Sequence, residues 1–328
     1  MTSIGEIWWS LPGESAVFYN KLVQRMGHGL VLRQEDRIPF RNILWEKVST
    51  AHGCPVRVLE WGERDRCPGD FLLKHLFTPK QRALYFPSES YGAYLASLAS
   101  ERMLVRITGI RGREMARQWE QLIDEYRTSG GHTLLLVAEC DRDAGPGALE
   151  HRVNPNQCRG FLLLLAGILN NTQIPDYQAE LAMNLAPHDP ELSSELLLQG
   201  EQLLLDVTQT AGEYGIDREQ SASAVQQTNL VCLFPKIERC RFVFAKKYWT
   251  ELMPYLPIRS VEGELIDDPM ELEVGHINYL IRNKGQLRNL PGADSIPLCA
   301  MVRNKIAHNQ QIPYATLATL NKLVPEQI

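Results

Sequence analysis

The 328-residue sequence has no apolar run long enough to cross a membrane and no excess of basic residues. Its longest apolar run, Phe161–Ile168, is far shorter than the roughly 20 residues of a membrane span. A net charge of -5 and a pI near 6.0 exclude a uniformly basic polymer-binding protein and disfavour an anionic membrane surface as a partner. We therefore expect a soluble, cytoplasmic protein.

The sequence also lacks the local signatures of common hydrolases and metal sites. It contains neither G-x-S-x-G nor H-E-x-x-H, and none of its seven cysteines forms a C-x2-C pair. An odd number of scattered cysteines, behind an N-terminus that does not resemble a signal peptide, indicates free thiols in a reducing compartment. We expect no metal and no cofactor.

The first 150 residues alternate between short apolar runs and helical patterns. Five runs have the length and composition of strands, namely residues 7–11, 30–32, 55–59, 103–107 and 132–138. Helix-like spacing of apolar residues lies between them, for example over 14–26, 40–48 and 113–126. This alternation predicts an α/β domain of about five mostly parallel strands with helices on both faces.

The chain changes character after residue 145. A polar stretch with glycine and proline predicts a linker over 146–158, between an α/β domain over 1–145 and a second domain over 159–328. The second domain contains mainly helical patterns and little alternation, which predicts a mainly α-helical bundle. Residues 235–245 are the exception, because their pattern fits a strand or a loop.

A nucleotide-binding role for the first domain needs a loop that cradles phosphates. The turn Ser10-Leu11-Pro12-Gly13-Glu14-Ser15 has a glycine and a serine, but Glu14 stands where the phosphate-binding lysine would be. The run 132–138 leads to Glu139, Cys140 and Asp141, an acid after a strand as in magnesium-binding NTPases. The layout resembles a degenerate P-loop NTPase of the AAA+ type that has lost its Walker lysine. The resemblance implies a structural or sensing domain.

Two other features of the first domain have ordinary structural explanations, which we favour. The tryptophans fit core packing better than a base-stacking platform; they are Trp8, Trp9, Trp45, Trp61 and Trp119. The stretch Gly109–Arg113 could offer amides and two cations to an anion, but it also fits a solvated turn before a helix.

The sharpest motif lies near the C-terminus, where Arg303, Asn304 and His308 form an R-N-x-x-x-H string. Arginine can hold a scissile phosphate and histidine can transfer protons near neutral pH, with the amide orienting one of them. Metal-independent cleavage of RNA by its ribose 2′-hydroxyl could use these groups. Two observations speak against this. Two helical residues that are five positions apart point in directions about 140° apart. Cations in the last turn of a helix are also explained by their favourable interaction with the helix dipole.

This string resembles the R-x4-6-H signature of the HEPN superfamily, whose fold is a helical bundle. The resemblance implies a ribonuclease of antiviral or toxin-like systems, with Arg303, Asn304 and His308 as catalytic residues. It also implies RNA as substrate, with tRNA among the candidates, and a composite site in a homodimer. Other members use the helical module for protein contacts, so both possibilities stay open.

A second cluster contains Glu271, Glu273 and His276 on one expected helix. Because Glu273 and His276 are three apart, they share a face and fit a hydrogen-bonded pair better than half of a metal site. If this helix packs beside the one that carries Arg303, Glu273 or His276 would support the site. The candidate RNA-backbone contacts are the basic residues Lys305, Arg239, Arg241, Lys246 and Lys247, although a charge run is usually a solvated face.

Two hypotheses follow. The first is a metal-independent endoribonuclease effector of a prokaryotic defence system, regulated through its N-terminal domain. The second is a non-catalytic regulatory or scaffold subunit of a defence complex, with a degenerate NTPase-like domain and a helical module for protein contacts. The sequence does not decide whether the chain is an enzyme.

Overall fold

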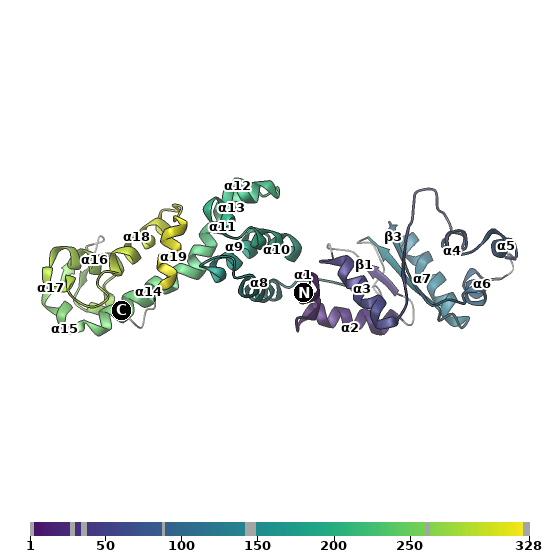
Figure 1. Ribbon diagram of the computed structural model, residues 1–328, viewed down its shortest axis with the longest axis horizontal. Helices are drawn as coiled ribbons and strands as arrows, with labels where there is room; N and C mark the ends of the chain where they lie inside the picture. The colour runs from purple at the N-terminus through teal and green to yellow at the C-terminus, as the bar shows by residue number, and fades with distance from the viewer. Residues whose placement is uncertain are drawn as a thin grey trace. The chain divides into compact units, whose positions relative to one another are not determined.

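The computed structural model describes residues 3–26, 30–33, 38–86, 89–141, 149–259 and 263–323. They form two compact units, Met1–Gln157 and Cys158–Ile328 (Figure 1). The boundary between these two units falls within the expected linker, 146–158, which also contains regular elements. Residues 146–148 lie outside the described residues, Leu149–Glu150 form a strand, and helix α8 begins at Pro155.

The first unit is built on a five-stranded parallel sheet in the order β2-β3-β4-β1-β5. Its strands are β1 (Leu30–Arg33), β2 (Val56–Glu60), β3 (Met103–Ile110), β4 (Leu134–Cys140) and β5 (Leu149–Glu150). All seven residues of β4 are buried, as expected for an apolar central strand with both faces covered. The predicted α/β class is confirmed, and so is the mainly helical character of the second half.

Helices cover both faces of this sheet (Figure 1). One face packs on α4 (Pro68–Leu76), α6 (Tyr91–Leu98) and α7 (Arg113–Thr128), with Trp119 fully buried between them. The other face carries α2 (Glu14–Met26) and α3 (Arg41–His52). The short α5 (Pro79–Arg82) follows α4. All five tryptophans of this unit are at most 8% exposed, so the core-packing interpretation is confirmed.

In the first unit, the strand predicted over the apolar run 7–11 is wrong. These residues belong mainly to helix α1 (Ile4–Ser10), which begins with Ser3 and Glu6 bonding each other's backbone N–H groups. Trp8 and Trp9 are adjacent and both buried, so the run is apolar because the helix packs into the core on two sides. The fifth strand of the sheet is β5, at the end of the unit.

The second unit is a helical assembly with one small hairpin of β6 (Ile258–Arg259) and β7 (Leu265–Ile266). Its first helices are α8 (Pro155–Leu169), α9 (Pro175–Leu185), α10 (Pro190–Leu198), α11 (Glu201–Leu205) and α12 (Val207–Glu213). Its last helices are α15 (Trp249–Leu252), α16 (Val274–Asn283), α17 (Gly285–Arg288), α18 (Ile296–Ala307) and α19 (Tyr314–Lys322). Short 3-10 turns occur at Met253–Tyr255 and Pro269–Glu271.

Between these groups runs an unbroken helical stretch made of α13 (Arg218–Thr228), a π-helical turn (Asn229–Leu233) and α14 (Phe234–Lys247). The prediction of a strand or loop over 235–245 is therefore wrong. Burial of Ile237, Cys240 and Phe244 against the unit's core outweighs the strand preference of the local sequence. Pro235 has no N–H to donate within the helix, and the neighbouring Phe234 N–H bonds the Asn229 carbonyl across a widened turn.

Candidate functional site

The sheet of the first unit has one place where connections leave in opposite directions. From β1 the chain crosses to β2 at one edge, whereas from β4 it passes to β5 on the other side of β1. In open α/β sheets, ligands bind beyond the carboxyl ends of the strands at such a point, which is called the switch point of the sheet. Here that point lies at the ends of β1 and β4, and helix α3 begins beside it at Arg41.

An ion cluster of three residues occupies this point. Glu139, near the end of β4, is 2% exposed and pairs with Arg41 and Arg106. The Arg106 Nε donates to Glu139 Oε1 at 2.9 Å, and an Arg41 Nη contacts the other carboxylate oxygen. The guanidinium of Arg106 also lies 4.5 Å from the ring centre of Trp45. Because Arg106 is opposite Val137 in the ladder, Glu139 is its diagonal neighbour on the same face.

The cluster has a fixed charge pattern of two cations and one anion. Burial, with a contribution from Arg41, lowers the pKa of Arg106 to about 9, so it remains cationic at neutral pH. Burial also lowers the pKa of Arg41. Both oxygens of Glu139 are engaged by arginine, so the carboxylate offsets part of the positive charge of the two buried or partly buried guanidinium groups.

The phosphate-loop prediction concerned the wrong segment. Residues 10–15 connect helices α1 and α2, so no strand ends there. The connection that does follow β1 covers residues 34–40, whose sequence Gln-Glu-Asp-Arg-Ile-Pro-Phe contains neither glycine nor lysine. Phe40 adopts a left-handed conformation immediately before Arg41, with φ of 48°. A phosphate cradle depends on glycines for close approach of backbone amides, and this sequence offers none.

The turn Gly109–Arg113 has a structural role. The Gly112 N–H donates to the Asp141 carboxylate at 2.9 Å, which ties the start of α7 to the end of β4. Gly109, with φ of 81°, lies so close to the Trp61 carbonyl that a Cβ would approach its oxygen to 2.8 Å. The interpretation as a turn before a helix agrees with these contacts.

The R-N-x-x-x-H string lies on helix α18, and the structure divides it between two hollows. Arg303 faces Glu273, with an Nη2–Oε2 distance of 3.0 Å. Its hollow also contains Glu238, Glu271 and Arg241, so carboxylates outnumber arginines there. His308 lies at the end of the helix and lines a different hollow with Asn304. The two key residues therefore do not converge within one chain, as their five-residue spacing implied.

The hollow at His308 is basic. Arg282, Lys305 and His308 line it together with Asn278 and Asn304, and no carboxylate is among its lining residues. The Lys305 Nζ donates to the Gln311 carbonyl at 3.3 Å. Sequence reasoning missed Arg282, although its position four residues after Asn278 on a helix that packs against α18 is a usable signal. Asn309, with φ of 51°, ends the helix as expected for a cap.

Glu273 is the residue before helix α16 rather than part of it. Its backbone N–H donates to His276 Nδ1 at 3.2 Å, so the expected pair is present at the start of the helix. Helices α16 and α18 pack together, and the Glu273 carboxylate reaches Arg303, whereas a supporting role for Glu273 or His276 in a site stays a prediction. Among the described residues, no group of three or more His, Cys, Asp or Glu side chains could hold a metal.

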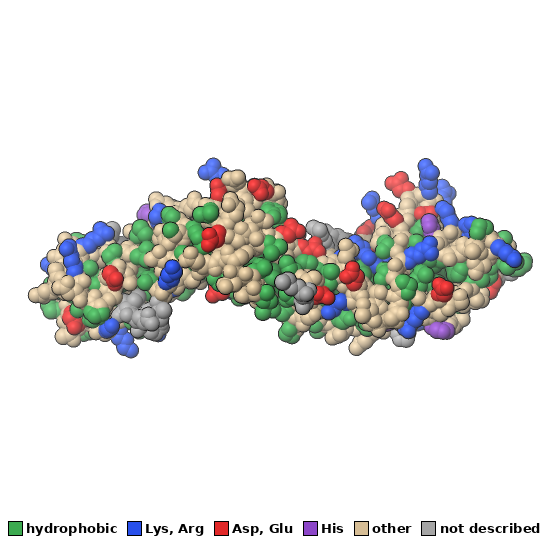
Figure 2. Space-filling view, in the orientation of Figure 1, with side chains coloured by type: hydrophobic (Ala, Val, Ile, Leu, Met, Phe, Trp, Pro, Cys, Tyr) green, Lys and Arg blue, Asp and Glu red, His purple; other side chains and the backbone are tan. Residues whose placement is uncertain are grey.

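The expected RNA-backbone contacts lie on α14, apart from Lys305. Arg241 is half-buried and is engaged by Glu238 and by the carbonyls of Met270 and Leu272. Arg239, Lys246 and Lys247 are not buried. On the face shown in Figure 2, acidic and basic side chains are interspersed over both units. That surface pattern is typical of solvated charge, and RNA contact by these residues stays a prediction.

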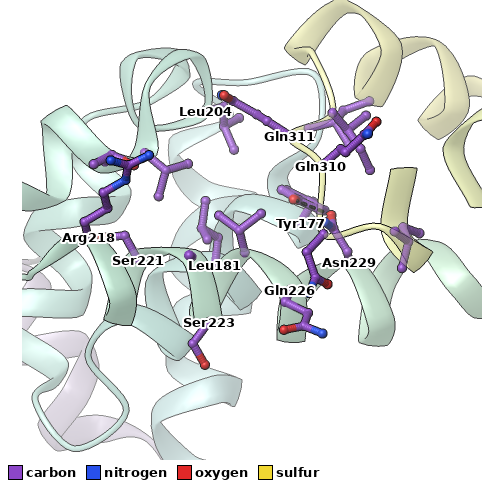
Figure 3. Close-up of a pocket in the computed structure, with 18 of the residues that line it drawn as sticks. Tyr177, Leu181, Leu204, Arg218, Ser221, Ser223, Gln226, Asn229, Gln310 and Gln311 are labelled. Carbon is purple, nitrogen blue, oxygen red and sulfur yellow. Dashed lines mark hydrogen bonds between the residues drawn. The ribbon is translucent and has the colours of Figure 1, made fainter. Parts of the chain in front are cut away.

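A larger cavity of about 430 Å³ lies elsewhere in the second unit (Figure 3). Helices α9, α11, α12 and α13 form most of its wall, and the segment between α18 and α19 closes another side. Tyr177, Gln226, Asn229 and Gln310 gather at one end, and Arg218 lies at the other (Figure 3). No motif in the sequence indicated this cavity, because its residues come from segments more than 100 positions apart.

No protein-family model and no curated protein sequence matches this chain. One solved structure with a similar fold is a variant of RuvB from Thermotoga maritima, with 14% sequence identity and a TM-score of 0.36. The match covers 97% of this chain and 90% of that one. The class defined by the fold itself is a parallel α/β unit followed by a mainly helical unit. Within the described part of the chain, no helix is both long and apolar enough to cross a membrane.

Proposed function

We propose that this protein is a non-catalytic regulatory or scaffold subunit built on an NTPase-like α/β unit that does not process nucleotides. The observation that carries the proposal is the pairing of Glu139 with Arg41 and Arg106 at the switch point of the sheet. An NTPase needs a free acid, a lysine and a glycine-rich loop there. This chain offers an engaged acid, two arginines and a connection without glycine.

The helical unit would supply the surfaces for a partner protein. Exposed aliphatic side chains lie along one stripe of α8, at Leu163, Leu164 and Ile168. Gly160 and Gly167 share that stripe, and nothing lies within 4 Å of a Cβ built on either. A contiguous exposed apolar stripe is typical of a protein contact. Membership of a defence complex stays a prediction from sequence resemblance alone.

Phosphate release from ATP and GTP, measured with magnesium on the full chain, tests this proposal. We expect no release above that of a buffer blank and no shift of the melting temperature on adding nucleotide. The matched variant is Arg41→Ala, which removes the cation at the start of α3. Turnover by the wild type that Arg41→Ala abolishes would contradict the proposal.

The endoribonuclease is the second candidate, because the hollow with Arg282, Lys305 and His308 has no lining carboxylate and could accept a phosphate. In this version, Arg282 of the same chain, rather than Arg303, holds the phosphate while His308 transfers a proton. Incubation with total RNA and tRNA in EDTA tests it. Cleavage that is lost in His308→Ala and Arg282→Gln but kept in Arg303→Ala would support this arrangement. Loss in Arg303→Ala as well would support the R-N-x-x-x-H motif assembled across two copies.

A further inference from the structure

The cavity of Figure 3 has the properties of a small-molecule site. Its volume of about 430 Å³ lies within the usual range of roughly 300–1,000 Å³ for ligand pockets. All of its lining residues belong to the second unit, between Tyr177 and Leu317. The cavity is therefore independent of the sheet on which the proposed function rests.

One buried side chain presents an unused hydrogen-bond donor to this cavity. Asn229 is 4% exposed and lies at the first position of the π-helical turn. Its Oδ1 accepts a hydrogen bond from the Tyr177 hydroxyl at 2.8 Å, and its amide nitrogen has no partner among the described residues. This nitrogen is not one of the fully buried unpaired side-chain atoms of the described residues, so it is accessible and can donate to an acceptor that enters the cavity.

Tyr177 fixes the orientation of that amide. Burial raises the pKa of Tyr177, so its hydroxyl keeps its proton at every physiological pH and can donate to Asn229. With the oxygen of Asn229 directed to Tyr177, the nitrogen is left for a ligand. Figure 3 shows both side chains at the same end of the cavity, beside Gln226 and Gln310.

The remaining lining residues indicate the shape and the charge of the ligand that the cavity can accept. The apolar lining is aliphatic, and Tyr177 is the one aromatic residue in it. Leu181, Leu204, Ile312 and Leu317 therefore offer contact to a flexible aliphatic chain rather than a stacking surface for a flat ring. The charged lining residues are one arginine, Arg218, and one glutamate, Glu219, whose charges cancel. A neutral ligand fits this balance, since an unpaired buried charge is costly.

We propose that this cavity binds an uncharged carbonyl compound with a short aliphatic chain, such as an amide, whose carbonyl oxygen accepts a hydrogen bond from the Asn229 amide nitrogen. The chain lies against Leu181, Leu204, Ile312 and Leu317. Gln226 and Gln310 are both exposed and form the solvent-facing end of the site.

A graded series of primary amides tests the proposal with the full-length protein. Butanamide, hexanamide and octanamide are titrated by calorimetry or by ligand-observed NMR, with hexanoate as the charged counterpart of hexanamide. Each added methylene is expected to raise affinity about fourfold until the cavity is filled. Hexanoate is expected to bind at least about tenfold more weakly than hexanamide. No binding of any amide at about 10 mM, or equal binding of hexanoate, would overturn the proposal.

Two variants test the hydrogen bond from Asn229 and the free volume of the cavity separately. Asn229→Asp keeps an acceptor for Tyr177 and removes the donor, so hexanamide should bind about tenfold more weakly or worse. Ala222→Leu fills the cavity from an exposed lining position without touching Asn229, and it should abolish binding even if Asn229→Asp fails to fold. Ser223→Ala, at the rim, is the matched control and should bind like the wild type. Unchanged hexanamide affinity in Ala222→Leu would overturn the proposal.

Discussion

Glu139 and Arg41 meet where strand β4 ends and helix α3 begins, with the carboxylate buried and the guanidinium partly exposed. Arg106 completes the contact from β3 at 2.9 Å. This arrangement places an ion cluster at the switch point of the sheet. The proposed scaffold role of the first unit rests on it.

Breaking this cluster should destabilise the protein strongly. Glu139→Gln leaves two buried or partly buried arginines without their anion, which costs on the order of 3 kcal/mol. The exposed Glu114→Gln on α7 removes the same charge and should change stability by less than about 0.5 kcal/mol. Urea unfolding of the two variants checks this. Equal stabilities would show that the cluster contributes nothing to the fold.

Helix α6 approaches α7 so closely that only glycine fits at position 92. A Cβ on Gly92 would lie 2.4 Å from the backbone nitrogen of Tyr126. Gly92→Ala should therefore destabilise by about 1–3 kcal/mol.

Gly160 on α8 is the matched control, because nothing lies within 4 Å of a Cβ placed on it. There the same substitution should stabilise by about 0.5–1 kcal/mol. Chemical denaturation of both variants gives the comparison, and a neutral Gly92→Ala would refute the close packing of α6 on α7.

Stability should fall at alkaline pH because of buried thiols. Burial is the largest cause that raises the pKa of Cys140 to about 12, and it also raises the pKa of Cys158 to about 11. In the unfolded chain a thiol loses its proton near pH ~8.5. The stabilisation from each thiol is therefore complete below that pH and is lost as pH rises towards the folded-state pKa, by roughly 2 kcal/mol per thiol at pH ~10.

Urea melts at about pH 7 and pH 10 measure this difference for the wild type and for Cys140→Ala. The substitution creates a small cavity, whose cost is the same at both pH values. The variant should nevertheless lose about 2 kcal/mol less between the two pH values. An identical loss in both proteins would mean that Cys140 titrates normally in the folded state.

The pair of Arg303 and Glu273 should matter little for stability. Its side chains are 36% and 59% exposed, so Glu273→Gln should cost less than about 1 kcal/mol. If Arg303 acts on RNA, freeing it from Glu273 should raise cleavage in EDTA by several-fold. Equal or lower cleavage in Glu273→Gln, in a preparation where the wild type cleaves, would exclude Arg303 as the phosphate-binding residue.

Sequence reasoning predicted the features that depend on local pattern. The alternation of strands and helices indicated the α/β class, and the run 132–138 became the buried central strand β4. The predictions for residues 7–11 and 235–245 were wrong for one reason, because apolar and β-branched side chains also occur in helices that pack against a core.

The sites were harder to predict, because they depend on register and packing between distant segments. Arg106 is a charge inside an apolar strand, which is a signal for a buried partner, but its partner follows only from the pairing of β3 with β4. Arg282 and Asn229 face their hollows through helix packing that no local motif encodes. The string at 303–308 predicted a helix end correctly, whereas its chemistry stays a prediction.

Calorimetric titration of the purified full-length protein with MgATP is the most direct test of the central claim. We predict no saturable heat at nucleotide concentrations up to about 1 mM, because Glu139, Arg41 and Arg106 occupy the switch point. Saturable binding with a micromolar Kd, abolished by Arg41→Ala in a protein that still melts cooperatively, would contradict this claim and restore nucleotide binding to the α/β unit.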